Sequence, residues 1–195
     1  MQGEGDEHIA PLLGLGTLLD NTLDAVRYGT SLSVFDSYVV NGQRTFMETC
    51  SLPVLDRIGV DLLVEAMAKA VSAGCAIFSH QFKGAASRVP VEATAFGLRR
   101  DHVLIEILAS FPDRPGGLEE RRHQRWVRDT RRAFDAIALP GGYPNLLASG
   151  ETDRAAESFG PNADRLSRVK QFYDPENVFC SAIPLPLGRR AIAAE

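Results

Sequence analysis

The sequence predicts an α+β domain in which a mainly antiparallel sheet carries helices packed on one face. Short segments rich in β-branched and aromatic residues predict the strands, and longer segments with apolar residues three or four positions apart predict the helices. These segments do not follow a strict strand–helix–strand alternation, which disfavours a parallel sheet. The 195 residues suit one domain with a substantial buried core.

The elements expected in the first half of the chain follow from residue type and spacing. Residues 31–40 are rich in β-branched and aromatic residues and predict a strand. Residues 52–71 place apolar side chains at helical spacing, with a proline where a first turn tolerates it, and predict a helix. Residues 75–82 alternate as a strand does, and residues 87–96 alternate more loosely.

The second half begins with the clearest strand, HVLIEILASF at residues 102–111. Residues 118–139 predict a long helix whose apolar stripe includes Trp126. The segment GGYPNLL, residues 141–147, predicts a further strand, and residues 161–174 predict the last helix. We therefore expect residues 1–195 to form a single domain, with loose ends at 1–8 and 187–195.

Composition argues against several classes of function. The net charge of -4 disfavours nucleic acid as a partner, since phosphate binding needs a surplus of basic residues. The chain shows neither a signal-peptide pattern nor an apolar stretch of about 18 residues, so we expect a cytoplasmic protein without a membrane span. The cysteines suggest no disulfide framework, and the histidines have no acidic or cysteine partner at ligand spacing, so no metal site is expected.

Glu106 stands out because it is charged in an otherwise apolar strand. On a strand, Glu106 shares its face with Leu104 and Leu108, while the intervening residues point to the other face. A carboxylate on a covered or cleft-lining face suits general acid–base chemistry. The alternative is a glutamate on a solvent-facing row or in a structural ion pair. The pattern alone leaves both interpretations open.

Tyr143 stands out because two glycines precede it. A tyrosine at a strand centre usually packs in the core and hydrogen bonds through its hydroxyl. Glycine in a strand often marks the close approach of a ligand or of another backbone. Asn145 lies two residues on, so strand periodicity would place its amide on the same face as the hydroxyl. The two side chains could line a binding wall.

A set of motifs in the C-terminal half carries a family resemblance. The motifs are Tyr143-Pro-Asn145, Phe159-Gly160-Pro-Asn162, Arg165-Leu166, Lys170, Tyr173-Asp174-Pro175, Asn177-Val-Phe179 and, upstream, GAASRVPVEATAFGLR at residues 84–99. Together they resemble the C-terminal end of FAD-linked oxidases of the berberine bridge enzyme-like group. The match runs from about residue 75 to residue 186. Two positions depart from the group's pattern: Leu146 replaces an aromatic residue, and Leu98 replaces a histidine.

The resemblance implies a substrate-binding domain whose antiparallel sheet forms the roof over a flavin. It implies Tyr143 and Glu106 as candidate catalytic bases and Asn145 as a residue near the cofactor. We further expect Leu104, Leu108 and His80 to contact the substrate. It also implies FAD as cofactor, although no FAD-binding motif is visible in this chain.

Three functions remain open at this stage. The leading one is the substrate-binding half of an FAD-dependent oxidoreductase that oxidises an alcohol or a natural-product-like small molecule. The FAD-binding domain would then come from a partner chain or from a missing domain, and a homo-oligomer is also possible. The second is a flavin-free acid–base enzyme, such as an isomerase, cyclase or dehydratase, on the same domain. The third is a non-catalytic ligand-binding subunit.

Overall fold

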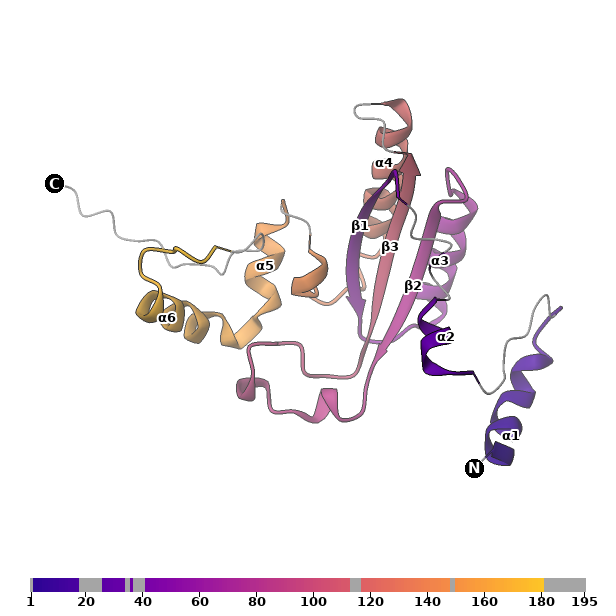
Figure 1. Ribbon diagram of the computed structural model, residues 1–195, viewed down its shortest axis with the longest axis horizontal. Helices are drawn as coiled ribbons and strands as arrows, with labels where there is room; N and C mark the ends of the chain where they lie inside the picture. Colours follow the sequence, from indigo (N-terminus) through magenta and orange to yellow (C-terminus); the bar gives the residue numbers. More distant parts are fainter. Residues whose placement is uncertain are drawn as a thin grey trace. The chain divides into compact units, whose positions relative to one another are not determined.

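The computed structural model describes residues 2–17, 26–33, 36, 41–112, 117–147 and 150–180 (Figure 1). The chain divides into two compact units, Met1–Asn41 and Gly42–Glu195, and each is described here by itself. None of the described helices is long and apolar enough to cross a membrane.

The first unit contains two helices, α1 (Gln2–Leu13) and α2 (Tyr28–Leu32), among its described residues. The strand expected at 31–40 is wrong at its start, since residues 31 and 32 end α2. The Ser31 hydroxyl bonds the Tyr28 carbonyl at 2.6 Å, a local side-chain bond that supports the turn. Most of the remaining positions of that expected strand lie outside the described residues. Residues 2–8, expected as a loose end, belong to α1, and residues 187–195 also lie outside the described part.

The second unit is built on a three-stranded sheet of β1 (Gln43–Leu52), β2 (Cys75–Phe82) and β3 (His102–Pro112). The strand order is β1-β3-β2, and both pairings are antiparallel. The expected strands at 75–82 and 102–111 are confirmed, and so is the α+β class. Because β3 is central, residues on β1 and β2 flank its side chains on both sides.

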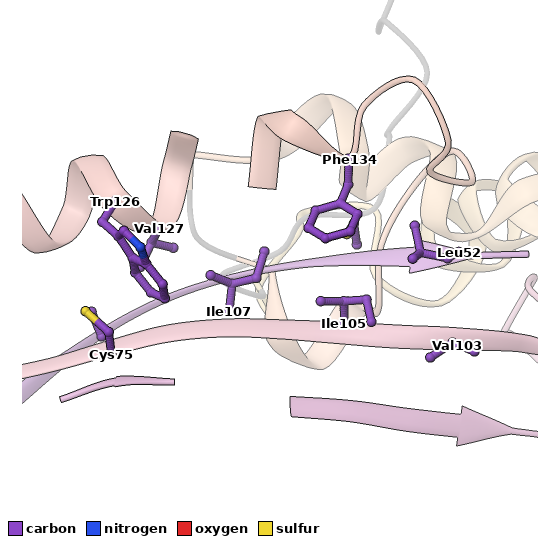
Figure 2. Packing of buried hydrophobic residues seen from close by; sticks show 10 residues of the cluster. Leu52, Cys75, Val103, Ile105, Ile107, Trp126, Val127 and Phe134 are labelled. Carbon is purple, nitrogen blue, oxygen red and sulfur yellow. The ribbon is translucent and has the colours of Figure 1, made fainter. Parts of the chain in front are cut away.

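The core lies between the sheet and the helices α3 (Arg57–Ala68) and α4 (Leu118–Ala133). The alternate β3 residues Val103, Ile105, Ile107 and Ala109 are all at most 5% exposed. Figure 2 shows Trp126, Val127 and Phe134 packed over Ile105 and Ile107. The Trp126 indole also donates to the Ala66 carbonyl at 3.0 Å, which joins α4 to α3. The alternation expected along β3 is therefore the observed burial pattern.

The predicted helix boundaries shift because local capping decides them. The helix expected at 52–71 begins at Arg57, where the Asp56 carboxylate accepts the Gly59 N–H at 2.9 Å as a helix cap. Leu52 instead ends β1 and is fully buried. The helix expected at 118–139 ends earlier, at Ala133.

Two expected strands are wrong. Residues 87–96 form short 3-10 turns at Ala86–Arg88 and Val91–Ala93, because Pro90 between them has no N–H to donate to a sheet. Residues 141–147 form a 3-10 turn at Pro144–Leu146, preceded by Gly141 at a φ of 78°. Near this segment the sheet gains a single bridge, in which the Leu139 N–H donates to Ser51 at 2.7 Å.

The C-terminal helices α5 (Thr152–Ser158) and α6 (Ala163–Tyr173) follow, and α6 confirms the helix expected at 161–174. Several residues that carried the family resemblance make structural hydrogen bonds here. The buried Asn162 amide donates to the Val91 and Thr94 carbonyls at 2.8 and 3.1 Å. These motif residues therefore hold the 3-10 segment against the start of α6.

Candidate functional site

The face of the sheet opposite α3 and α4 carries the predicted site residues that lie on strands, and we call it the open face. It presents Leu104, Glu106 and Leu108 from β3 and Phe78 and His80 from β2. The three β3 side chains are partly buried, in contrast to the fully buried residues between them. Phe78 is 39% exposed, which is unusual for a phenylalanine on a sheet. The open face is thus apolar at Leu104, Leu108 and Phe78 and polar at His80 and Glu106. On its β1 side, the buried polar residues Thr49 and Ser51 lie opposite Glu106 and Leu104.

Those two polar groups, Glu106 and His80, form a pair. His80 lies opposite Leu104, so it is a diagonal neighbour of Glu106, and its Nε2 lies 3.0 Å from the Glu106 carboxylate. The Glu106 side chain is 19% exposed and that of His80 is 54% exposed. Sequence spacing gives no sign of this partner, because strand pairing joins His80 to a residue that is distant in the chain.

The pairing fixes what the imidazole can do. An ionised Glu106 accepts a hydrogen bond, so the proton of a neutral His80 sits on Nε2. Nδ1 then remains as a basic nitrogen. A proton taken up at Nδ1 would create an imidazolium that the adjacent carboxylate stabilises. The pair can therefore act as one proton-accepting unit.

Tyr143 lies in the turn region after Gly142 rather than on a strand. Its hydroxyl accepts a hydrogen bond from the Asn145 amide at 3.3 Å, and its ring meets Phe96 edge-on with centroids 6.1 Å apart. Strand periodicity predicts the proximity of Tyr143 and Asn145, but the 3-10 turn produces it. Asn145 is exposed and Tyr143 is partly exposed, so both side chains are accessible.

A cavity of about 140 Å³ joins Tyr143 to the end of the open face. Of the predicted site residues, Tyr143, His80 and Leu104 line it. Sequence reasoning missed the other lining residues, which are Ser51, Gln81, Phe82, Phe96, Leu98, His102 and Gly142. Phe96 and Leu98 belong to the motif segment at residues 84–99, which carries the resemblance, so the sequence offered a signal for these two residues. Ser51, Gln81, Phe82 and His102 come together through the register of the strands, which the sequence does not show.

A larger groove of about 400 Å³ lies between α3 and α4. Its lining includes Leu62, Trp126 and exposed charged side chains, and none of the predicted site residues. Size alone therefore does not mark the site. We take the smaller cavity as the candidate site, because three of the predicted site residues line it.

The glycines before Tyr143 lie too close to neighbouring atoms of the protein to carry a side chain. A Cβ at Gly141 would lie 2.9 Å from the backbone of Glu157, and its φ of 78° is itself unfavourable for other residues. The Gly142 N–H donates to the Ser158 hydroxyl at 2.9 Å. Gly141 therefore accommodates the backbone of α5, whereas a Cβ at Gly142 would meet the side chains of Leu147 and Arg154 at 2.5 and 3.0 Å. Helix α5 thereby fixes the segment that carries Tyr143.

His102 forms the inner wall of the cavity. It is 5% exposed, its Nδ1 lies 2.7 Å from the Arg100 carbonyl, and its ring stacks on Phe82 at 4.5 Å. Burial is the main cause that lowers the pKa of His102 below its usual value, and the hydrogen bond to Arg100 opposes the shift. The imidazole is therefore held neutral, with its Nδ1 proton donated to the carbonyl.

The lowered pKa of His102 predicts a loss of stability in mild acid. Below about pH 6.5 the unfolded chain binds a proton that the folded chain resists. Neutral His102 therefore contributes its full share of the free energy of unfolding above that pH. This share is lost as the pH falls toward the pKa of the folded state, by no more than about 1.4 kcal/mol per pH unit. Urea unfolding at a series of pH values between about 7.5 and 5 measures this loss of stability.

The matched control for this prediction is His8→Gln, since His8 is an exposed histidine of α1. His102→Gln should flatten the dependence on pH, whereas His8→Gln should leave it unchanged. An equal slope in the wild type and in His102→Gln would contradict the assignment.

Comparisons with known proteins support the resemblance. Residues 142–186 match the family model described as "Berberine and berberine like". The uncharacterized FAD-linked oxidoreductase YgaK of Bacillus subtilis (strain 168) is 26% identical over 187 residues, which are 94% of this chain and 40% of YgaK. YvdP of the same organism, also an FAD-linked oxidoreductase, is 32% identical over 106 residues, covering 54% of this chain and 23% of YvdP. The chain is related to the berberine-like FAD-linked oxidoreductases.

Solved structures show that the fold is shared as well. A histidine-to-alanine variant of berberine bridge enzyme superposes with a TM-score of 0.74 and 14% identity, over 95% of this chain and 44% of that enzyme. Berberine bridge enzyme-like 1 of Physcomitrella patens gives a TM-score of 0.61 and 18% identity, over 75% and 31% of the two chains. The chain spans less than half the length of these relatives and corresponds to their C-terminal part.

Proposed function

We propose that this chain is the substrate-binding and catalytic part of an FAD-dependent oxidoreductase that oxidises an alcohol or a related small molecule. The observation that carries the proposal is the open face, where the His80–Glu106 pair lies beside the cavity that holds Tyr143. FAD would be bound by the region of the relatives that lies outside the match, either on the same polypeptide or on a partner chain.

The open face fits one side of a planar ring system such as that of FAD. It offers apolar surface from Leu104, Leu108 and Phe78, and hydrogen-bonding groups from His80 and Glu106. The core helices cover the opposite face. No phosphate-binding glycine loop occurs in the sequence, so the residues fit the ring and not the nucleotide end of the cofactor.

The proposed chemistry separates a proton from a hydride. Bound FAD would supply the hydride acceptor. The hydroxyl proton of the substrate would pass to the His80–Glu106 pair, where the carboxylate stabilises the resulting imidazolium. The Tyr143 hydroxyl, already held by Asn145, would orient the substrate oxygen, and the exposed Asn145 amide would lie toward the cofactor.

The experiment is purification of the chain from its native cells through an affinity tag at its C-terminus. The tag captures the flavin-binding region whether it lies on the same polypeptide or on a partner. We expect visible flavin absorption that is bleached anaerobically by an alcohol substrate. A colourless preparation that retains no flavin after incubation with FAD and removal of the unbound cofactor would contradict the proposal.

A second candidate is a flavin-free acid–base enzyme, as in an isomerase or a dehydratase. One observation favours it: this chain alone assembles the His80–Glu106 pair and the Tyr143–Asn145 contact. Turnover of a substrate by colourless protein, lost in both Tyr143→Phe and Glu106→Gln, would establish this function instead.

A further inference from the structure

We propose that the cavity beside Tyr143 binds a single aromatic ring bearing a neutral hydroxyl group, as in a benzylic alcohol. The assignment of this ring to the substrate rests on the proposed function, whereas the binding itself does not. Nothing in the comparisons names a ligand for this chain. The inference follows from the size of the cavity, the nature of its walls and its charge.

The size of the cavity limits what can enter. Its volume is about 140 Å³. An apolar protein cavity of roughly 150 Å³ binds benzene. One six-membered ring therefore fits, whereas a fused polycycle would have to extend out of the cavity along the open face. The cavity is also partly open, so a substituent on the ring can reach the His80–Glu106 pair.

The walls of the cavity favour an aromatic ring over a saturated one. Phe82 and Phe96 have centroids 5.4 Å apart at an interplanar angle of 42°, and Tyr143 meets Phe96 edge-on at 6.1 Å. Aromatic rings attract one another in such tilted and edge-on arrangements beyond simple area burial. An aryl ring should thus bind roughly two- to tenfold more tightly than its saturated analogue.

The walls are also held in place before a ligand arrives. Phe82 stacks on His102 at 4.5 Å, and the Arg99 guanidinium lies 5.0 Å from the Phe96 centroid. Arg99 is itself fixed by the Ala86 carbonyl at 3.0 Å. A preorganised wall loses little freedom on binding, which favours affinity.

The charge around the cavity favours a neutral ligand with a hydroxyl group. The lining contains no aspartate, glutamate, lysine or arginine. The polar side chains of the lining are those of Tyr143, His80, Ser51, Gln81 and His102. Of these, we assign the Tyr143 phenol and the His80 imidazole to the ligand hydroxyl. Glu106 lies directly behind His80, so a ligand carboxylate would be repelled. Benzyl alcohol fits these requirements, and benzoate does not.

The test is a titration of the isotope-labelled 195-residue chain, without flavin, followed by aromatic NMR signals. Benzyl alcohol should shift the signals of Phe82, Phe96 and Tyr143 saturably. Cyclohexylmethanol, a saturated analogue, should bind roughly two- to tenfold more weakly. Benzoate should produce no saturable shift. Equal affinity for the two alcohols would overturn the inference, and so would equal binding of benzoate.

A matched pair of variants locates the binding. Leu98→Trp places a large side chain in the cavity wall and should abolish the shifts, whereas Leu118→Trp, at a position 66% exposed on α4, should leave them unchanged. If Leu98→Trp does not give a folded spectrum, Phe96→Leu serves instead and should reduce the preference for the aryl ring. Undiminished binding in a folded Leu98→Trp chain would overturn the inference.

The outcome is separable from that of the proposed function. A preparation that carries flavin but binds no aryl alcohol contradicts only the aromatic site. A colourless preparation that binds benzyl alcohol contradicts only the flavin-dependent reaction.

Discussion

Replacing Phe134 with alanine should lower the free energy of unfolding by about 3–5 kcal/mol. Phe134 is fully buried and packs with Leu52 and Ile105 between α4 and the sheet (Figure 2). It is also the cap residue at the end of α4, where its N–H donates to the Arg131 carbonyl at 3.1 Å. The substitution removes a whole ring from a site whose neighbours are held on both sides, so the resulting cavity cannot easily collapse.

Urea unfolding followed by circular dichroism measures this loss, and Phe172→Ala is the matched control. Phe172 is 77% exposed on α6, so the same substitution should change stability by no more than about 0.5 kcal/mol. Equal destabilisation by the two substitutions would show that the core between α4 and the sheet does not hold this fold together.

The core strand could be predicted from sequence, but the edge strand β1 could not. Every second residue of β3 is apolar and buried, and local alternation is sufficient to reveal that. On β1, Glu48 lies among the buried positions and is paired with Arg128 and Arg131 of α4, each at 3.9 Å. Burial is the main cause that raises the pKa of Glu48. A charged residue neutralised by a distant helix interrupts the pattern that predicts a strand.

The candidate site was predictable one residue at a time but not as an arrangement. Glu106 was identified because it is charged within an apolar strand, and Tyr143 because glycines precede it. The partner of Glu106 depends on the register of β2 against β3, which residue spacing does not contain. Phe96 ends the strand expected at 87–96, whereas the structure brings Phe96 and Leu98 to the cavity outside any strand.

The Tyr143–Asn145 contact shows how a correct proximity can follow from the wrong local structure. A strand would place the two side chains on one face because they are two residues apart. The 3-10 turn at Pro144–Leu146 brings them together instead, at 3.3 Å. The turn is decided by Gly141 and by the close approach of α5, which are tertiary features. Local pattern therefore predicted a contact whose cause lies elsewhere in the fold.

Glu106→Gln in the flavin-containing protein should slow substrate-dependent flavin reduction by roughly 10²- to 10⁴-fold, the usual contribution of general acid–base catalysis. Glutamine keeps a hydrogen bond to His80 but removes the negative charge that stabilises the imidazolium. Stopped-flow mixing without oxygen measures the rate, with the alcohol that bleaches the flavin fastest in a screen. Glu65→Gln is the matched control, since Glu65 is exposed on α3 and pairs only with a neighbouring surface lysine.

His80→Gln should lower the rate by a similar factor, and the double variant should be little slower than either single one. Two residues that act as one proton-accepting unit show strongly non-additive effects, because removing either disables the other. Substrate binding provides a second readout: the Kd of the substrate should change far less than the rate of flavin reduction in His80→Gln. Additive losses, or rates retained in both single variants, would contradict the His80–Glu106 pair as the base. Tyr143 would then be the candidate base. Tyr143→Phe tests it, with the exposed Tyr173→Phe as the control.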